Sequence, residues 1–140
     1  MAAAFPKLFS SFTILLFLAL TMDCYHELVH MDYIYLLAGK AQCTLNDFTI
    51  GTVRTDTLIG GKSEWKVTVI NTCHCGVQQI YLNCKGFQTV EKIDPNIFSV
   101  HGDRCLLIGG KLLPSKGSVN FAYAWDPPFL LSPAATTSAC

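Results

Sequence analysis

Apolar and polar side chains alternate along most of the chain after residue 42. An aromatic-rich face alternates with small or polar residues at 119–125, and bulky apolar side chains alternate with mixed ones at 65–70. A period of two is typical of a β-strand with one buried face. The same pattern predicts a strand at 77–84, with weaker candidates at 44–53 and 104–108. No window in this part of the chain has the 3.6-residue period of an amphipathic helix.

Turn-forming residues separate these strand candidates. Glycine, proline, asparagine and aspartate cluster at Gly60-Gly61, Asp94–Asn96, His101–Asp103, Gly109-Gly110 and Pro114–Gly117. Such clusters between apolar segments favour tight turns. Many short strands with regular turns over about 100 residues predict an all-β fold, a small antiparallel β-sandwich stapled by disulfides. A small closed barrel is the alternative architecture.

The N-terminal segment has a different pattern, a continuous apolar run at residues 8–20. The run follows Lys7 and is shorter than the roughly 20 residues that a membrane span needs, so it is predicted to be a signal peptide. Small residues precede both Met22 and Gln42, and either position suits cleavage. The later site is favoured because it removes Cys24 and leaves six cysteines.

We therefore expect residues 1–41 to be a signal peptide, with a pro-segment or an anchored N-terminus as open alternatives. Residues 42–140 form the expected mature domain. This organisation predicts a secreted, extracellular protein with no stable membrane insertion after the signal is cleaved.

Six cysteines lie in the expected mature domain, and in a secreted chain an even number predicts a disulfide framework. They are Cys43, Cys73, Cys75, Cys84, Cys105 and Cys140. Because Cys73 and Cys75 are two residues apart, their sulfurs face one side, and a bond between them would be strained. Each is expected to bond a different partner. Six cysteines allow about 15 connectivities, and the sequence does not choose among them. A zinc site of both thiolates with His74 or His101 is not expected, since no second close ligand pair follows. No metal or cofactor is predicted.

Charge and motif content exclude several functional classes. Residues 42–140 carry eight basic and seven acidic side chains, so no basic field is available for nucleic acid or anionic lipid. The segment Gly60–Ser63 resembles the end of a phosphate-binding loop, but Asp56 stands where its first glycine is required. No nucleophile elbow is present. Glu91, Asp94 and Asp103 could supply paired carboxylates for glycoside hydrolysis, but Asp94-Pro95 and Gly102-Asp103 are interpreted first as turns. The chain is therefore not expected to be an enzyme.

Two groups of residues are candidate binding sites. Lys85, Phe87 and Phe98 lie in expected surface turns, where aromatic rings near polar residues suit protein contact. The alternative is that both phenylalanines cap the core. Trp65, Tyr123 and Trp125 could form a sugar-stacking platform, although aromatic residues at a period of two more often belong to the core.

Five sequence segments together resemble the Tapetum Determinant family of plant secreted cysteine-rich proteins. They are WKVTVINTCHC at 65–75, LNCKGFQTV at 82–90, Asp94-Pro95, GDRCL at 102–106 and VNFAYAW at 119–125 before a terminal cysteine. The resemblance covers residues 42–140. It implies an extracellular ligand of a leucine-rich-repeat receptor kinase that guides cell fate in reproductive tissue, especially the anther tapetum. It also implies that the six cysteines of the domain are the family framework.

Two functional hypotheses follow. The first is a ligand, secreted to the apoplast, whose disulfides hold its turns rigid for docking on the receptor kinase ectodomain, with little ordering entropy lost. The second is a cell-wall carbohydrate-binding module without catalytic activity, because residues 117–125 also resemble a late strand of plant cellulose-binding sandwiches. Exposed, coplanar Trp65, Tyr123 or Trp125 would favour the second hypothesis, and burial of all three would count against it.

Overall fold

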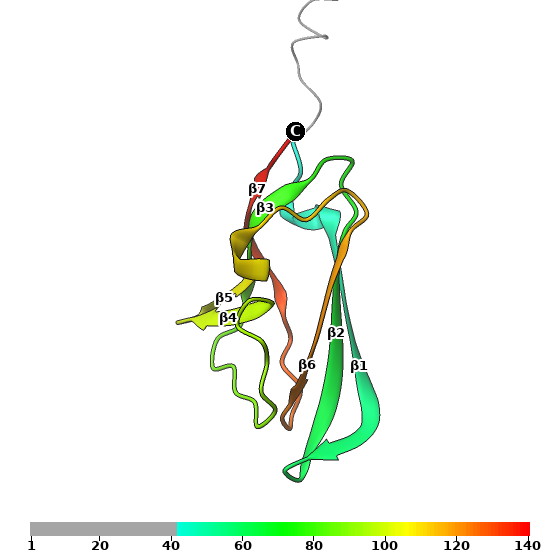
Figure 1. Ribbon diagram of the computed structural model, residues 1–140, viewed down its shortest axis with the longest axis vertical. Coiled ribbons are helices and arrows are strands. Elements are labelled where there is room, and N and C mark those ends of the chain that lie inside the picture. The colour runs from blue at the N-terminus through cyan, green and yellow to red at the C-terminus, as the bar shows by residue number, and fades with distance from the viewer. Residues whose placement is uncertain (1–41) are drawn as a thin grey trace, which may run out of the picture. The chain divides into compact units, whose positions relative to one another are not determined.

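The computed structural model describes residues 42–140, which form a β-sandwich of two antiparallel sheets (Figure 1). The predicted signal segment lies outside the described residues. The sandwich contains seven strands and two short 3-10 helices. They are η1 Leu45–Asp47, β1 Phe48–Ile59, β2 Lys62–Asn71, β3 Val77–Asn83, β4 Phe98–His101, β5 Arg104–Leu107, η2 Ile108–Gly110, β6 Ser118–Ala124 and β7 Ser132–Ser138. The prediction of an all-β antiparallel sandwich is confirmed.

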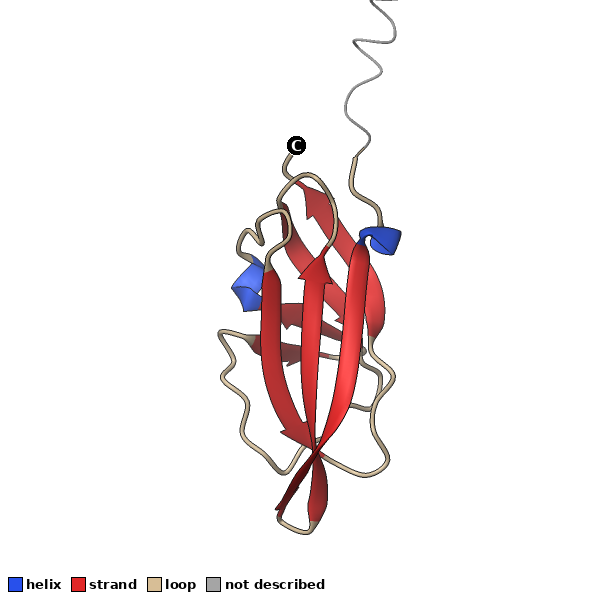
Figure 2. Ribbon diagram, turned by 90° about the vertical axis from the view of Figure 1, so that its right-hand side faces the viewer, coloured by secondary structure: helices blue, strands red, loops and turns tan. Residues whose placement is uncertain are grey.

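One sheet has the strand order β1-β2-β6 and the other has the order β4-β5-β3-β7. Figure 2 looks onto the three-stranded sheet, with the turn between β1 and β2 projecting at one end. That turn is Gly60-Gly61, between the paired residues Ile59 and Lys62, and both glycines have positive φ (56° and 77°). A two-residue turn with two left-handed positions matches the twist of an antiparallel hairpin.

The core lies between the sheets, and the residues at a period of two supply much of it. In β2 and β6, Val67 faces Phe121 and Val69 faces Val119 across the strand pair. All four side chains are buried. An aromatic cluster extends this core, with Phe98 stacked on Phe121 at a centroid distance of 4.4 Å. The alternation therefore predicted the buried faces of both strands.

Two strands were not predicted from the sequence. β4 and β5, of four residues each, form a hairpin around Gly102-Asp103, where Gly102 has a φ of 64°. β7 has the sequence SPAATTS, which contains neither bulky alternation nor a β-branched apolar residue. It pairs with β3 with two register shifts. Tertiary pairing with an existing strand thus overrides a weak local preference.

Within residues 42–140, no helix has the length and apolar character that a membrane crossing requires.

Candidate functional site

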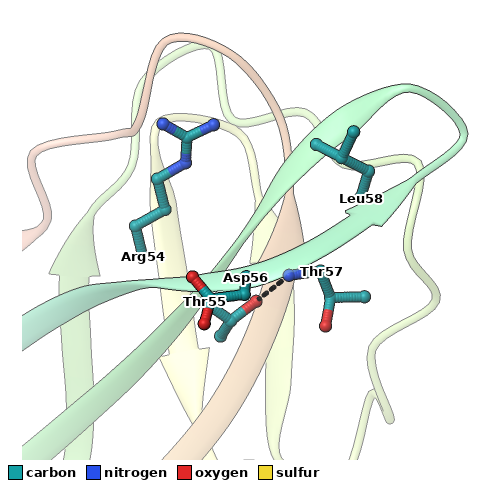
Figure 3. A pocket seen from close by; sticks show the side chains of 5 residues that line it. All are labelled: Arg54, Thr55, Asp56, Thr57 and Leu58. Atoms are coloured by element: carbon teal, nitrogen blue, oxygen red, sulfur yellow. Dashed lines mark hydrogen bonds between the residues drawn. The ribbon is translucent and has the colours of Figure 1, made fainter.

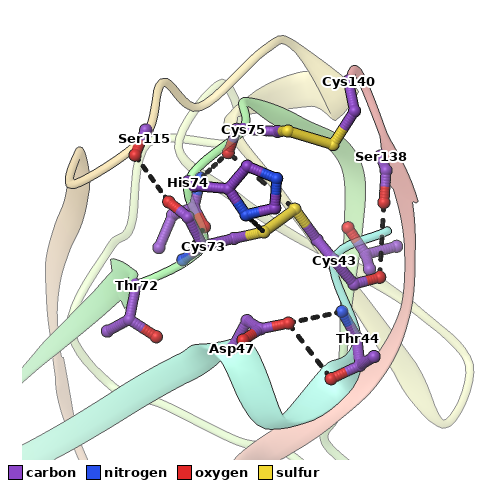
Figure 4. Close-up of a disulfide and its surroundings, with 12 residues drawn as sticks. Cys43, Thr44, Asp47, Thr72, Cys73, His74, Cys75, Ser115, Ser138 and Cys140 are labelled. Atoms are coloured by element: carbon purple, nitrogen blue, oxygen red, sulfur yellow. Dashed lines mark hydrogen bonds between the residues drawn. A yellow bond between two sulfur atoms is a disulfide. The ribbon is translucent and has the colours of Figure 1, made fainter. Parts of the chain in front are cut away.

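Two disulfides meet at one end of the sandwich, which we call the disulfide pole (Figure 4). The turn between β2 and β3 supplies Cys73 and Cys75, which bond Cys43 and Cys140 respectively. The expectation that these two cysteines take different partners is confirmed. The bonds attach the turn to the segment before η1 and to the end of the chain after β7. A third disulfide, Cys84–Cys105, joins the end of β3 to β5.

Asn71 organises the same pole from the inside. It is fully buried at the end of β2, and its Nδ2 donates to the carbonyl oxygens of Cys75 (2.9 Å), Pro114 (3.1 Å) and Leu113 (3.3 Å). Its Oδ1 accepts a hydrogen bond from the Cys73 N–H (3.0 Å). One amide therefore holds the cysteine-bearing turn against the loop that precedes β6, so the pole is fixed by polar contacts as well as by sulfur.

The sulfurs of Cys43, Cys75 and Cys140 lie within 4.8 Å of one another. All three are consumed in disulfides, so in this oxidised state they present no thiolate to a metal ion. His74 is exposed beside them, with its Nδ1 3.7 Å from the Cys73 sulfur. The three sulfurs therefore act as covalent crosslinks between chain segments.

A surface hollow of 340 Å³ lies beside the loop between β3 and β4. We call it the aromatic hollow. Its lining comprises Phe87, Gln88, Thr89, Glu91, Lys92, Ile93, Phe98 and Val100. Two of the predicted partner-contact residues, Phe87 and Phe98, thus come together, with ring centroids 4.9 Å apart. Val100 is 51% exposed, so an apolar side chain at the hollow faces solvent.

The individual placements of the three candidates differ. Lys85 is exposed and Phe87 is half-buried, whereas Phe98 is only 3% exposed. The expectation that Phe98 is an exposed turn residue was wrong, because Phe98 begins strand β4 and its ring stacks on Phe121 inside the sandwich. Phe98 therefore supports the hollow from the core side and offers little surface for contact.

The loop that borders the hollow is held to the three-stranded sheet by a few hydrogen bonds. The Val90 N–H donates to the Ala124 carbonyl (3.0 Å), and the Ala124 N–H donates to Thr89 Oγ1 (3.0 Å). Thr89 Oγ1 also accepts from the Glu91 N–H (3.1 Å). These bonds fasten the loop to the end of β6 and fix the position of Glu91.

Glu91 is the electrostatically unusual residue of this region. Its Oε2 is buried and has no hydrogen-bond partner among the described residues. Burial raises the pKa of Glu91 above its ordinary value, and the neighbouring charge of Glu64 raises it further. In the sequence, Glu91 was considered only as one of three carboxylates that could pair for glycoside hydrolysis, because nothing in its local sequence indicates that its Oε2 is buried.

Comparison with known proteins gives a family for this arrangement. The family model described as "Tapetum determinant 1, C-terminal" matches residues 44–140, which is most of the chain. The chain belongs to the Tapetum determinant family. A curated relative is "TPD1 protein homolog 1A" of Oryza sativa subsp. japonica, 31% identical over 101 residues that cover 66% of this chain and 45% of the relative. The chain thus spans less than half the length of that relative. No solved structure matches the present chain.

The family match places five of the six framework cysteines inside the matched segment, with Cys43 directly before it. All six are paired in the structure. In this Tapetum determinant domain the cysteines therefore form the structural framework that the resemblance implied.

The three candidate sugar-stacking residues do not form a common exposed surface. Tyr123 is fully buried, and its hydroxyl oxygen accepts a hydrogen bond from the Phe129 N–H (2.9 Å). Trp65 is half-buried and donates its Nε1–H to the Trp125 carbonyl (2.9 Å). Trp125 is also half-buried, with the Lys62 ammonium 4.8 Å from its ring centroid. Tyr123 thus belongs to the core, as the alternative interpretation held.

A second surface hollow, of 390 Å³, lies along β1 (Figure 3). A bulge between Arg54 and Leu58 forms it, and all its lining residues come from that one segment. The Thr57 N–H donates to Thr55 Oγ1 (3.1 Å), which closes the bulge on itself. All the lining side chains come from one segment, so the hollow does not bring together groups from different elements as a binding site would. It marks the point where the regular part of β1 ends.

Proposed function

We propose that this Tapetum determinant domain is an extracellular protein ligand that docks on the ectodomain of a plant leucine-rich-repeat receptor kinase. It acts by binding and not by catalysis, in cell-fate signalling during reproductive development in the anther and its tapetum. Family membership supports the proposal at the level of the domain. The observation that carries it further is the aromatic hollow, a surface of mixed apolar and polar side chains that is supported from behind by aromatic rings.

The hollow is suited to docking because its core side and the start of its bordering loop are fixed before a partner arrives. The Cys84–Cys105 bond anchors the start of the bordering loop to β5. Behind the hollow, the Phe87 ring packs on Phe98 and Tyr123 at centroid distances of 4.9 and 5.3 Å. A preorganised surface loses little conformational entropy on binding, which favours affinity. Lys92 is exposed at the hollow, and the exposed Lys85 precedes Phe87 by two residues in the sequence.

The test is a binding assay against immobilised ectodomains of a panel of plant leucine-rich-repeat receptor kinases. The variant combines Lys85→Ala, Lys92→Ala and Val100→Ala. It removes two exposed groups that line the hollow, at Lys92 and Val100, together with the exposed predicted contact residue Lys85, and it leaves Phe98 in the core. We expect the wild-type domain to bind at least one ectodomain and the variant to lose affinity about tenfold or more, which corresponds to about 1.4 kcal/mol.

A matched control combines Lys66→Ala, Lys111→Ala and Leu112→Ala, three exposed residues of similar type that do not line the hollow. The control is expected to bind like the wild type, and thermal unfolding verifies that both variants are folded. An equal loss of affinity in the two variants would mean that the docking surface does not lie at the hollow. Failure of the wild type to bind any ectodomain would contradict the receptor-ligand proposal itself.

Secretion to the apoplast is part of the same proposal and has its own test. Unreduced mass spectrometry of the protein released by plant cells should find a chain that begins near Gln42. Its mass should lack six hydrogens, as the three bonds Cys43–Cys73, Cys75–Cys140 and Cys84–Cys105 require. A cell-associated product that retains Cys24 and free thiols would contradict it.

The carbohydrate-binding alternative predicts retention on insoluble glucan, whereas the ligand proposal predicts none.

A further inference from the structure

The outer edge of β1 presents backbone hydrogen-bonding groups that the domain leaves unpaired. The Thr72 N–H donates to the Asp47 carbonyl (2.8 Å), so this pair is hydrogen-bonded between the two strands. Because hydrogen-bonded pairs alternate along an antiparallel register, Thr49, Gly51 and Val53 direct their backbone groups to β2. The residues between them direct their N–H and C=O groups away from the sheet: Phe48, Ile50, Thr52 and Arg54.

The bonds between β2 and β6 confirm this assignment independently. The Asn71 N–H donates to Gly117 and the Trp125 N–H to Ser63 (3.0 and 3.1 Å). The odd-numbered residues of β2 therefore face β6, which leaves its even-numbered residues for β1. Within residues 42–140, no group bonds the outward N–H or C=O of Ile50 or Thr52.

The other three sheet edges are shorter or obstructed. β4 has four residues, and β7 contains Pro133 and irregular register. The edge of β6 is bonded at Ala124 by the loop residues Thr89 and Val90. β1, in contrast, has regular register from Phe48 to Arg54, with no proline and a single charge. Soluble proteins usually protect such an edge, so its openness points to a strand that covers it.

The regular segment is self-complementary about its centre. It is limited by η1 before Phe48 and by the bulge after Arg54, so Gly51 is its middle residue. Antiparallel pairing with a second copy over the whole segment sets Gly51 opposite Gly51. The outward-facing residues then lie opposite one another, Ile50 with the second copy's Thr52 and Phe48 with its Arg54, so every outward N–H and C=O meets its complement.

The side chains and charge are compatible with this register. Val53, which is 66% exposed on the solvent face, lies opposite the second copy's Thr49, and β-branched pairs of this kind favour strand pairing. The two Arg54 side chains lie at opposite ends of the paired segment, so no like charges face each other. Gly51 has neither a positive φ nor a neighbouring atom that requires glycine. The fold of one copy therefore does not require glycine at position 51.

We propose that two copies of this domain pair antiparallel through β1, with Gly51 on the two-fold axis, to form a continuous six-stranded sheet. The dimer goes beyond the receptor-ligand proposal and does not depend on it. A dimeric ligand would present two copies of the aromatic hollow to its partners. The occupant of the β1 edge is thus a second copy of the same chain.

The first test is analytical ultracentrifugation of the oxidised domain. Thr52→Pro removes an outward N–H and places a ring in the interface, and proline is tolerated at an edge position whose N–H faces solvent. Thr52→Ala, the matched control, loses the same side chain and keeps the N–H. At ~100 µM we expect dimeric wild type and Thr52→Ala protein, and at least a tenfold higher dimer dissociation constant for Thr52→Pro.

The second test determines the register by crosslinking. Residues opposite each other in a non-hydrogen-bonded pair have Cα atoms about 4.5 Å apart, within the range of a disulfide. Gly51→Cys should therefore form a covalent dimer under mild oxidation, with the new bond located by unreduced peptide mapping. Val53→Cys is the control, because its two copies would be about 14 Å apart along the strands.

A wild-type domain that remains monomeric at ~100 µM would overturn the proposal. Equal crosslinking of Gly51→Cys and Val53→Cys would overturn the register, and an unchanged Thr52→Pro dimer would overturn the location. If the protein is monomeric and Thr52→Pro abolishes ectodomain binding, the edge is occupied by the receptor and the dimer is wrong. Neither assay of the free domain contains a receptor, so failure of the dimer and failure of the ligand proposal are distinguishable.

Discussion

Asn71 offers the sharpest test of how the disulfide pole is held together. Replacing it with alanine removes four hydrogen bonds at a fully buried position. The three shorter bonds join it to Cys75, Pro114 and Cys73 and have lengths of 2.9–3.1 Å. At about 1 kcal/mol net each they account for about 3 kcal/mol. The Cys73 N–H then remains buried without a partner, which adds about 1 kcal/mol or more.

We therefore expect Asn71→Ala to lower the free energy of unfolding by about 4 kcal/mol, a large part of the stability of a domain this size. The measurement is equilibrium denaturant unfolding of the oxidised domain, with disulfides intact in both proteins. Asn120→Ala is the control, since Asn120 is exposed and makes one side-chain bond, accepted from the Thr68 hydroxyl (2.7 Å). Its cost should be below about 1 kcal/mol.

Equal destabilisation by the two alanine variants would refute the reasoning, because it would mean that burial and bond number at the pole are irrelevant. Asn71→Asp adds a second check of the same geometry. The amide NH₂ points at three carbonyl oxygens, and a carboxylate there would meet them without a proton. That variant should be least stable at neutral pH and should recover stability as the pH falls and the introduced group is protonated.

Three further outcomes follow from the contacts described. Phe98→Ala should cost about 3–5 kcal/mol in thermal or denaturant unfolding, whereas the half-buried Phe87 should cost less. A larger loss of unfolding free energy for Phe87→Ala than for Phe98→Ala would contradict the assignment of Phe98 as the more deeply buried core residue. Glu91→Gln should gain stability over the wild type as the pH rises through and above the ordinary pKa of a glutamate, because the wild-type carboxyl, whose pKa is raised by burial, loses folding stability as it ionises and the amide does not. A pH-independent difference would contradict the account of the unpartnered oxygen. Removing the Cys84–Cys105 bond, which closes a loop of 21 residues, by a double serine substitution should cost about 3 kcal/mol, and a negligible cost would mean that β3 and β5 hold together without it.

The strands that could be predicted are those whose side chains alternate in size and polarity. β2 and β6 were predicted from residues 65–70 and 119–125 because a buried face at a period of two is encoded locally. β7 was not, because Pro133 and its small neighbours contain no such pattern. It forms where β3 offers a free edge and the Cys75–Cys140 bond closes the chain end. Such a strand depends on its neighbours, and a single sequence does not specify them.

The site was less accessible to sequence reasoning for the same physical cause. The spacing of Cys73 and Cys75 required two different partners, but the choice of Cys43 and Cys140 depends on which segments meet at the pole. Phe98 lies among turn residues in the sequence, and only the folding of its loop places the ring on Phe121. Exposure is a property of the tertiary structure, so a residue near a turn is a weak guide to a contact surface.

The crosslinks divide the domain into a fixed end and a less constrained one. All three disulfides attach to segments that flank β3: Cys73 and Cys75 precede the strand and Cys84 follows it. The tip of the β1–β2 hairpin and the tip of the loop beside the hollow carry none, and the loop is fastened mainly by its bonds to Ala124. Local opening requires less free energy where few bonds must break. Adjustment to a partner should therefore be confined to these tips, while β3, the disulfide pole and the core side of the hollow keep their geometry.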